Sequence, residues 1–259
     1  MFHINIVIFV TTLLFQFLLE KYLFFQFKKH SFSITRFPCN IPIKNVKGKA
    51  IAFLSYTDST NGLLTPDDTE KRTIYTSETS IIRRQLEEAK KKADVVIVGC
   101  HWGNVDSHVV SDDQKNFAKF LAENGADMII GTHPHVVEDA EWLETKDGRS
   151  VFCAYSLGNF FSAQMRTDEL VGMVLECNIK TIISPTGEVK VEIEKPLFFP
   201  IITDYGNGGS EAHVKWLSEY SPAEAKKHGV RNIDNQFTYQ YINKLLKKNV
   251  QSEFLVLPE

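Results

Sequence analysis

Cysteine is scarce in this chain, and its spacing excludes two common roles. Four cysteines occur among 259 residues, and no two of them stand in a CxxC pattern. Closely spaced cysteine pairs are typical of structural zinc sites and redox motifs, so neither is expected here. Cys100 and Cys153 lie in apolar, strand-like runs. This setting predicts buried free thiols rather than disulfides.

An excess of positive charge is also missing. The formal net charge is −3, and no internal repeat is present. Proteins that bind nucleic acid usually carry a strongly basic face, so we expect no nucleic-acid partner. With 43% hydrophobic residues, the chain is long enough for one large domain or two small ones.

Charged side chains are absent from the first 19 residues, whereas seven of the 19 phenylalanines fall between Phe2 and Phe27. As a helix, this run at ~1.5 Å per residue would reach about the ~30 Å of a bilayer core. No small-residue cleavage site follows it, which favours a membrane anchor over a signal peptide. We therefore expect residues 1–43 to be an apolar N-terminal helix and a linker, as a membrane anchor or a foreign start. The globular domain is expected at residues 44–259.

The charge around the apolar run bears on where the domain would lie. The basic residues nearest to the run all follow it, and they are Lys21, Lys28, Lys29 and Arg36. If the run is an anchor, the positive-inside rule places the main domain in the cytoplasm. Without an anchor, the chain is expected to be cytoplasmic as well.

Alternating strand and helix signals follow from residue 50 onward. Residues 50–56 and 94–100 are short apolar runs, as buried strands are, and residues 80–92 between them show helical spacing. A capping box at Ser111–Gln114 starts a second helix, and residues 126–130 repeat the strand signal. Strand, helix and strand at this spacing form a βαβ unit with parallel neighbouring strands, so we expect an α/β fold.

The second half of the chain predicts antiparallel strands and two helices. Residues 136–143 and 150–155 are expected to pair across a turn at Asp147-Gly148, and residues 172–183 to pair with 188–199. Helices are expected at residues 212–220 and 237–248. His213 and His228, which lie in this part, are interpreted as surface residues.

The strongest chemical signal is Gly131-Thr132-His133-Pro134-His135. In an extended backbone, residues i and i+2 point to the same face, and the proline stiffens that geometry. His101 ends the preceding predicted strand, and parallel strands bring their carboxyl ends together, where α/β folds bind ligands. The three imidazoles therefore predict a metal site. The alternative is a pair of surface or hydrogen-bonded loop histidines.

Three motifs in one order carry a family resemblance. They are His101-Trp102-Gly103-Asn104, Gly131-Thr132-His133-Pro134-His135 and Tyr155-Ser156-Leu157-Gly158-Asn159-Phe160. From about Lys44 onward, the chain resembles the CapA-type poly-γ-glutamate capsule synthesis proteins, which are similar in fold to calcineurin-like metallophosphoesterases. The resemblance implies the carboxyl part of a metallophosphoesterase-like α/β sandwich, with βαβ units and antiparallel strands.

The resemblance also implies a site and its ligands. His101, His133 and His135 would hold a divalent metal ion, which would be manganese, zinc or iron. The residues expected to line the cleft or contact the ligands are Asn61, Trp102, Asn104 and Asn159. The expected partner is a capsule or cell-envelope polymer, or its precursor, and the family resemblance favours association with a membrane.

The departures from the family pattern limit this expectation. Family members begin with a strand ending in Gly-Asp, then an Asn-x-Glu and an Asn-Asn-His segment, which supply the remaining ligands and a proton donor. None of these precedes Lys44. We therefore expect an incomplete domain that lacks half of the metal site and has an open edge beside residues 50–56.

Three function classes remain. The first is a metal-dependent hydrolase-like protein acting on a phosphoester or amide, and the second is a non-catalytic remnant or binding module with the same fold. The third rests on Ala154–Gly158, which is similar to the nucleophile elbow of serine hydrolases. A helix should follow such an elbow, but residues 159–161 favour strand or loop, so this class is disfavoured.

Overall fold

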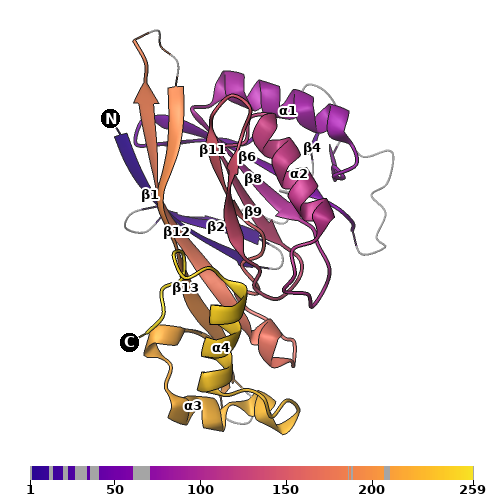
Figure 1. The fold of residues 1–259 in the computed structure, drawn as a ribbon, viewed down its shortest axis with the longest axis vertical. Helices are drawn as coiled ribbons and strands as arrows, with labels where there is room; N and C mark the ends of the chain where they lie inside the picture. Colours follow the sequence, from indigo (N-terminus) through magenta and orange to yellow (C-terminus); the bar gives the residue numbers. More distant parts are fainter. Residues whose placement is uncertain are drawn as a thin grey trace.

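The computed structural model describes residues 2–11, 14–19, 23–26, 34–35, 41–60, 71–185, 187, 189–206 and 211–258, with side chains described at residues 41–60 and from residue 73 onward. Its elements form three layers, in which two helices cover one face of a central sheet and a second sheet covers the other (Figure 1). The predicted α/β fold is confirmed.

The central sheet contains the predicted βαβ unit. Its strand order is β10-β11-β9-β8-β6-β5. The strands are β5 (Ile43–Val46), β6 (Lys49–Thr57), β8 (Val95–His101), β9 (Met128–Thr132), β10 (Ala140–Glu144) and β11 (Ser150–Ala154). The four inner strands run parallel, whereas β5 and β10 are antiparallel at the two edges. The edge of β6 that we expected to be open is therefore paired with β5.

Burial on both faces explains the continuous apolar strands. On β8, Val96 and Val98 pack toward α1 (Thr79–Lys92) and α2 (Asp112–Glu123), whereas Val95 and Ile97 pack toward the second sheet. Parallel strands covered on two faces need apolar side chains at every position. The predicted capping box at Ser111 and Gln114 is present at the start of α2.

The second sheet holds the late antiparallel strands. β12 (Val171–Ile183) pairs with β13 (Val189–Gly206), which confirms the predicted hairpin. β14 (Glu211–Trp216) then pairs with the far edge of β13, and a short helical turn, η3 (Leu217–Glu219), follows it. The helix predicted at residues 212–220 is therefore wrong, because the free edge of β13 gives this segment backbone partners that its own sequence does not reveal.

The predicted N-terminal helix is also wrong. The segment instead contains β1 (Phe2–Thr11), β2 (Leu14–Leu19) and β3 (Leu23–Gln26), and β1 pairs antiparallel with β12, with Ile6 opposite Cys177. Isoleucine, valine and phenylalanine favour strands, and the edge of β12 provides a partner. Across the described residues, no helix is both long and apolar enough to cross a membrane. A two-residue ladder joins β4 (Ile34–Thr35) to β7 (Lys71–Arg72).

The C-terminal part packs at one end of the second sheet (Figure 1). It consists of α3 (Pro222–Lys227), the turn η4 (Gly229–Asn232) and α4 (Tyr239–Asn249), the last of which confirms a predicted helix. The surface interpretation of His228 is wrong, because this residue is only 3% exposed and its Nδ1 accepts a hydrogen bond from the Val230 backbone. Cys100, Cys153 and Cys177 are free and buried, as predicted for the first two.

Candidate metal centre

Three imidazoles meet at the carboxyl ends of β8 and β9. His101 is the last residue of β8 and lies beside Thr132 of β9, and His133 follows immediately. The ring centroids of His101 and His133 are 4.2 Å apart, and those of His133 and His135 are 6.1 Å apart. The parallel sheet thus brings together the three side chains that the sequence singles out.

We expected an extended backbone at the two later histidines, and this expectation is wrong. His133 has a φ of 103° and His135 a φ of 65°, and Asp106, which donates its backbone N–H to the Pro134 oxygen, has a φ of 62°. These are three of the five non-glycine residues with positive φ in the described ranges. Such conformations cost free energy in L residues and concentrate at functional sites.

Burial favours the neutral form of His101 and of His133. It lowers the pKa of His101 to about 4, and the neighbouring His133 and His135 add to the effect. Burial also lowers the pKa of His133, with a further contribution from His135 and an opposing one from Asp58. The neutral imidazole is the form that binds metal ions.

Asn159 fixes the tautomer of His135. The Asn159 amide nitrogen lies within hydrogen-bond distance of three acceptors, which share its two N–H groups: the backbone oxygens of His135 and Glu169 and the side-chain oxygen of Gln164. Its Oδ1 therefore accepts, and it lies 3.1 Å from His135 Nδ1. His135 must then carry its proton on Nδ1 and keep a lone pair on Nε2. Asn159 is 3% exposed, and its side chain contacts His135 from within the protein.

Unsatisfied polar atoms gather around the same segment. Within the described part of the chain, four buried side-chain atoms have no hydrogen-bond partner, and three of them belong to Asp106, His133 and Glu138. The orphan atom of His133 is Nδ1. Burying a polar group without a partner costs about 1–3 kcal/mol, so such groups are rare in native structures and often mark a site.

Glu138 is fully buried beside this cluster. Gln114 Nε2 donates to its Oε2 at 2.7 Å, and the orientation of the Gln114 amide is fixed because its Oε1 accepts from the backbone and hydroxyl of Ser111. Burial raises the pKa of Glu138 to about 7. Gln114 thus bonds both Ser111, the N-cap residue of α2, and the carboxyl group of Glu138.

Two loops are joined at the rim of the cluster. His108 Nδ1 lies 2.7 Å from the Val137 oxygen, and its Nε2 lies 3.1 Å from Asp168 in the short helix η1 (Thr167–Leu170). Arg166 bonds to Asp106 in the same region. These contacts hold the loop after β8 against the segment before β12.

Several residues singled out from the sequence have other places. Trp102 is 1% exposed and its indole nitrogen donates to the Tyr155 oxygen, so it supports the fold rather than lining a cleft. Asn104 is exposed and its backbone oxygen accepts from Ser107. Asn61 lies outside the described residues. Ser156 is buried and donates to the Val136 oxygen, which rules it out as an exposed nucleophile.

Asp58, a carboxylate near the histidines, was not predicted from the sequence to belong to the site. Asp58 follows β6, accepts from the Gly103 backbone at 3.2 Å and from Thr76 Oγ1 at 2.7 Å, and acts electrostatically on His133. An acidic residue directly after a predicted parallel strand was the available signal.

The cluster is not a ready coordination sphere. Among the residues that the structure describes, no three His, Cys, Asp or Glu side chains are arranged so that they could already hold a metal ion. The donor chemistry nevertheless fits one divalent ion, since burial favours neutral imidazoles at His101 and His133, His135 presents Nε2 and His133 Nδ1 has no protein partner.

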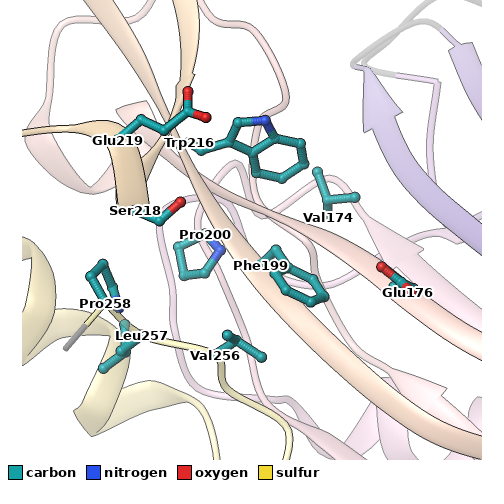
Figure 2. A pocket seen from close by; sticks show the side chains of 10 residues that line it. All are labelled: Val174, Glu176, Phe199, Pro200, Trp216, Ser218, Glu219, Val256, Leu257 and Pro258. Atoms are coloured by element: carbon teal, nitrogen blue, oxygen red, sulfur yellow. The ribbon is translucent and has the colours of Figure 1, made fainter.

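Two cavities lie away from this centre. One of about 380 Å³ is bounded by β12, β13, β14 and the C-terminal tail, with Trp216 and Phe199 on its wall (Figure 2). Another of about 510 Å³ lies along β10 and β13. None of the three histidines lines either cavity.

Comparisons with known proteins point to one family. Residues 37–164 match the sequence model of "Bacterial capsule synthesis protein PGA_cap". The chain is 35% identical over 152 residues to the PGA biosynthesis protein CapA of Bacillus subtilis (strain 168), which covers 58% of this chain and 38% of that protein. It is 35% identical over 126 residues to the capsule biosynthesis protein CapA of Bacillus anthracis, covering 47% and 29%.

The chain therefore spans well under half the length of these curated relatives. Among solved structures, a proposed 5'-nucleotidase from Staphylococcus aureus in complex with alpha-ketoglutarate aligns with a TM-score of 0.37 and 18% identity, over 63% of this chain and 30% of that one. That likeness is too loose to bear on function. The segment that matches the PGA_cap model of bacterial capsule synthesis proteins, residues 37–164, contains all three histidines.

Proposed function

We propose that this chain acts in the synthesis of a capsule or cell-envelope polymer and binds one divalent metal ion through His101, His133 and His135. The observation that carries the proposal is the convergence of three imidazoles at adjacent strand ends, one of which has a buried, unpartnered Nδ1. The family match and the two CapA relatives support the polymer as the partner.

A divalent ion at such a centre supplies a Lewis acid and lowers the pKa of a bound water. The three histidines would bind this ion through their ring nitrogen atoms. Asn159 holds His135 with its Nε2 unprotonated. Manganese, zinc and iron all accept imidazole ligands, and hydrolysis of a phosphoester or an amide is the reaction type that such a centre serves.

Metal titration of the purified chain tests this proposal. Zinc and manganese binding would be followed by calorimetry and by the manganese electron paramagnetic resonance signal. We expect one ion per chain, with His133→Ala weakening binding by more than the roughly 10- to 100-fold that is typical when an outer contact of a ligand is lost. The control is His213→Ala, which removes an exposed imidazole on β14. Absence of binding, or equal binding by the two variants, would refute the proposal.

A second candidate is a binding module without catalysis. It is favoured because two nearby carboxylates have partners within the protein: Asp58 accepts from Gly103 and Thr76, and one oxygen of Asp106 pairs with Arg166. This candidate predicts that poly-γ-glutamate binds the chain equally well with and without a chelator. Loss of polymer binding on chelation would favour the metal centre instead. Membrane association is part of the same proposal, and co-flotation with lipid vesicles tests it.

A further inference from the structure

The last residue of β6, Thr57, contacts the candidate metal centre through its hydroxyl. Thr57 and His101 are partners in the parallel register of β6 and β8, so their side chains leave the sheet side by side. Thr57 Oγ1 lies 3.0 Å from His101 Nδ1. Thr57 is 3% exposed, and its backbone is held on both sides, by the Ile74 oxygen and the Thr76 N–H.

A count of donors and acceptors decides the direction of this hydrogen bond. Thr57 Oγ1 lies 2.6 Å from the backbone oxygen of Ser59, and a carbonyl oxygen can only accept. The single hydroxyl proton of Thr57 is therefore directed at Ser59. The contact with His101 must then be made by an Nδ1–H that donates to the threonine oxygen.

We propose that Thr57 is a positioning residue, whose hydroxyl accepts the Nδ1 proton of His101 and so leaves Nε2 of His101 unprotonated for a metal ion. The inference rests on the proposed metal-binding function and adds a residue outside the three ligands. A neutral imidazole has one protonated nitrogen, so the partner of one nitrogen determines the state of the other.

The same device serves His135 from the other side of the centre. There an amide oxygen, Asn159 Oδ1, takes the place of the hydroxyl. His101 at the end of β8 and His135 in the segment after β9 are thus fixed in the same tautomer by acceptors that are both nearly buried. An acceptor that is itself tied to a carbonyl, as Thr57 is to Ser59, cannot turn to donate without losing its own bond.

The test measures the His101 tautomer in metal-free protein and the metal affinity of matched variants. Long-range ¹H–¹⁵N correlation spectra distinguish Nδ1–H from Nε2–H imidazoles. Thr57→Val removes the hydroxyl and keeps the shape, whereas Thr57→Ser keeps the hydroxyl. Thr181→Val is the control, because Thr181 is buried in β12 and its hydroxyl has no partner.

We expect His101 to be protonated on Nδ1 in the wild type, in Thr57→Ser and in Thr181→Val. In Thr57→Val, the Nε2–H form should appear and zinc affinity should fall about 10- to 100-fold, the range for lost outer contacts of a ligand. Thr57→Ser, which keeps the hydroxyl, should bind zinc with the wild-type affinity. A merely structural role for Thr57 would change stability without moving the tautomer.

The outcomes separate this inference from the metal proposal. Wild-type His101 protonated on Nε2, or Thr57→Val with unchanged tautomer and affinity, would overturn the role of Thr57. If the tautomers behave as expected while no variant binds metal, Thr57 sets the tautomer and the metal proposal fails. If Thr57→Val does not fold, the wild-type spectrum and the serine variant still decide the direction of the bond.

Discussion

The indole nitrogen of Trp102 donates to the backbone oxygen of Tyr155 at 2.9 Å, directly over Gly131 of β9. A Cβ on Gly131 would stand 1.8 Å from that oxygen and 2.3 Å from the indole nitrogen. Real Cβ atoms do not approach so closely, so a side chain here must push β11 or Trp102 away. The glycine before the histidine pair is thus required by packing.

We predict that Gly131→Ala destabilises the protein by about 3 kcal/mol or more, at the upper end of the cost of overpacking. The matched control is Gly148→Ala, where φ is +80° but no atom lies within 4 Å of the added Cβ, so only a backbone cost of about 1–2 kcal/mol is expected. Urea unfolding midpoints measure both. An equal loss in the two variants would contradict the packing argument.

Glu138 predicts a pH dependence of stability. Burial raises its pKa from 4.5 to about 7, so between these values the folded chain holds a proton that the unfolded chain has lost. Stability therefore falls as pH rises through this window. Glu138→Gln removes the loss and should stabilise the protein at pH 8 by up to about 3 kcal/mol, at about 1.4 kcal/mol per pKa unit.

The difference between Glu138→Gln and the wild type should shrink below about pH 5, where both side chains are neutral. Thermal unfolding between pH 4.5 and 8 measures it. Glu144→Gln, at the exposed end of β10, is the control and should show no such trend. A variant that is less stable than the wild type at pH 8 would show that Glu138 is held ionised by a partner.

The pairing of β1 with β12 can be tested by hydrogen exchange. Amides of β12 in the stretch paired with β1, residues 175–181, should exchange slowly, because β12 is paired with β1 on one side and with β13 on the other. Ile6→Pro, which removes a donor opposite Cys177, should speed up exchange there and leave the amides of β9 protected. Unchanged exchange in β12 would favour an N-terminal segment that stands apart from the sheet.

We predict no hydrolysis of a generic aryl phosphodiester above background with added manganese or zinc. The three histidines provide ligands for at most one ion, and two carboxylates near them, Asp58 and Asp106, have partners within the protein. Hydrolysis requires a polarised phosphate, an activated water and a proton donor. A spectrophotometric assay measures it, and turnover that disappears in His133→Ala would show the prediction to be wrong.

Local sequence patterns predicted the centre of the fold. The apolar run of β8, the capping box at Ser111 and the strand before His133 each carry their signal within a few residues. Because parallel strands end at one edge, the approach of His101 to His133 followed from the order of elements alone. The positive φ of the two later histidines did not, since no local rule places imidazoles in that conformation.

The failures concern partners that lie far away in the sequence. β1 finds β12 more than 160 residues later, and β14 becomes a strand because β13 has a free edge. An apolar run such as residues 2–11 suits helix and strand alike, so the distant edge decides. Asp58 and Thr57 were missed for a related reason, since their roles depend on the register of β6 with β8.

The left-handed backbone at His133 and His135 bears on how this sequence would change over generations. Glycine adopts such conformations without strain, whereas other residues incur on the order of 1–3 kcal/mol each. A copy released from selection for its chemistry would therefore gain stability by exchanging either histidine for glycine, through a change that selection for folding alone would favour.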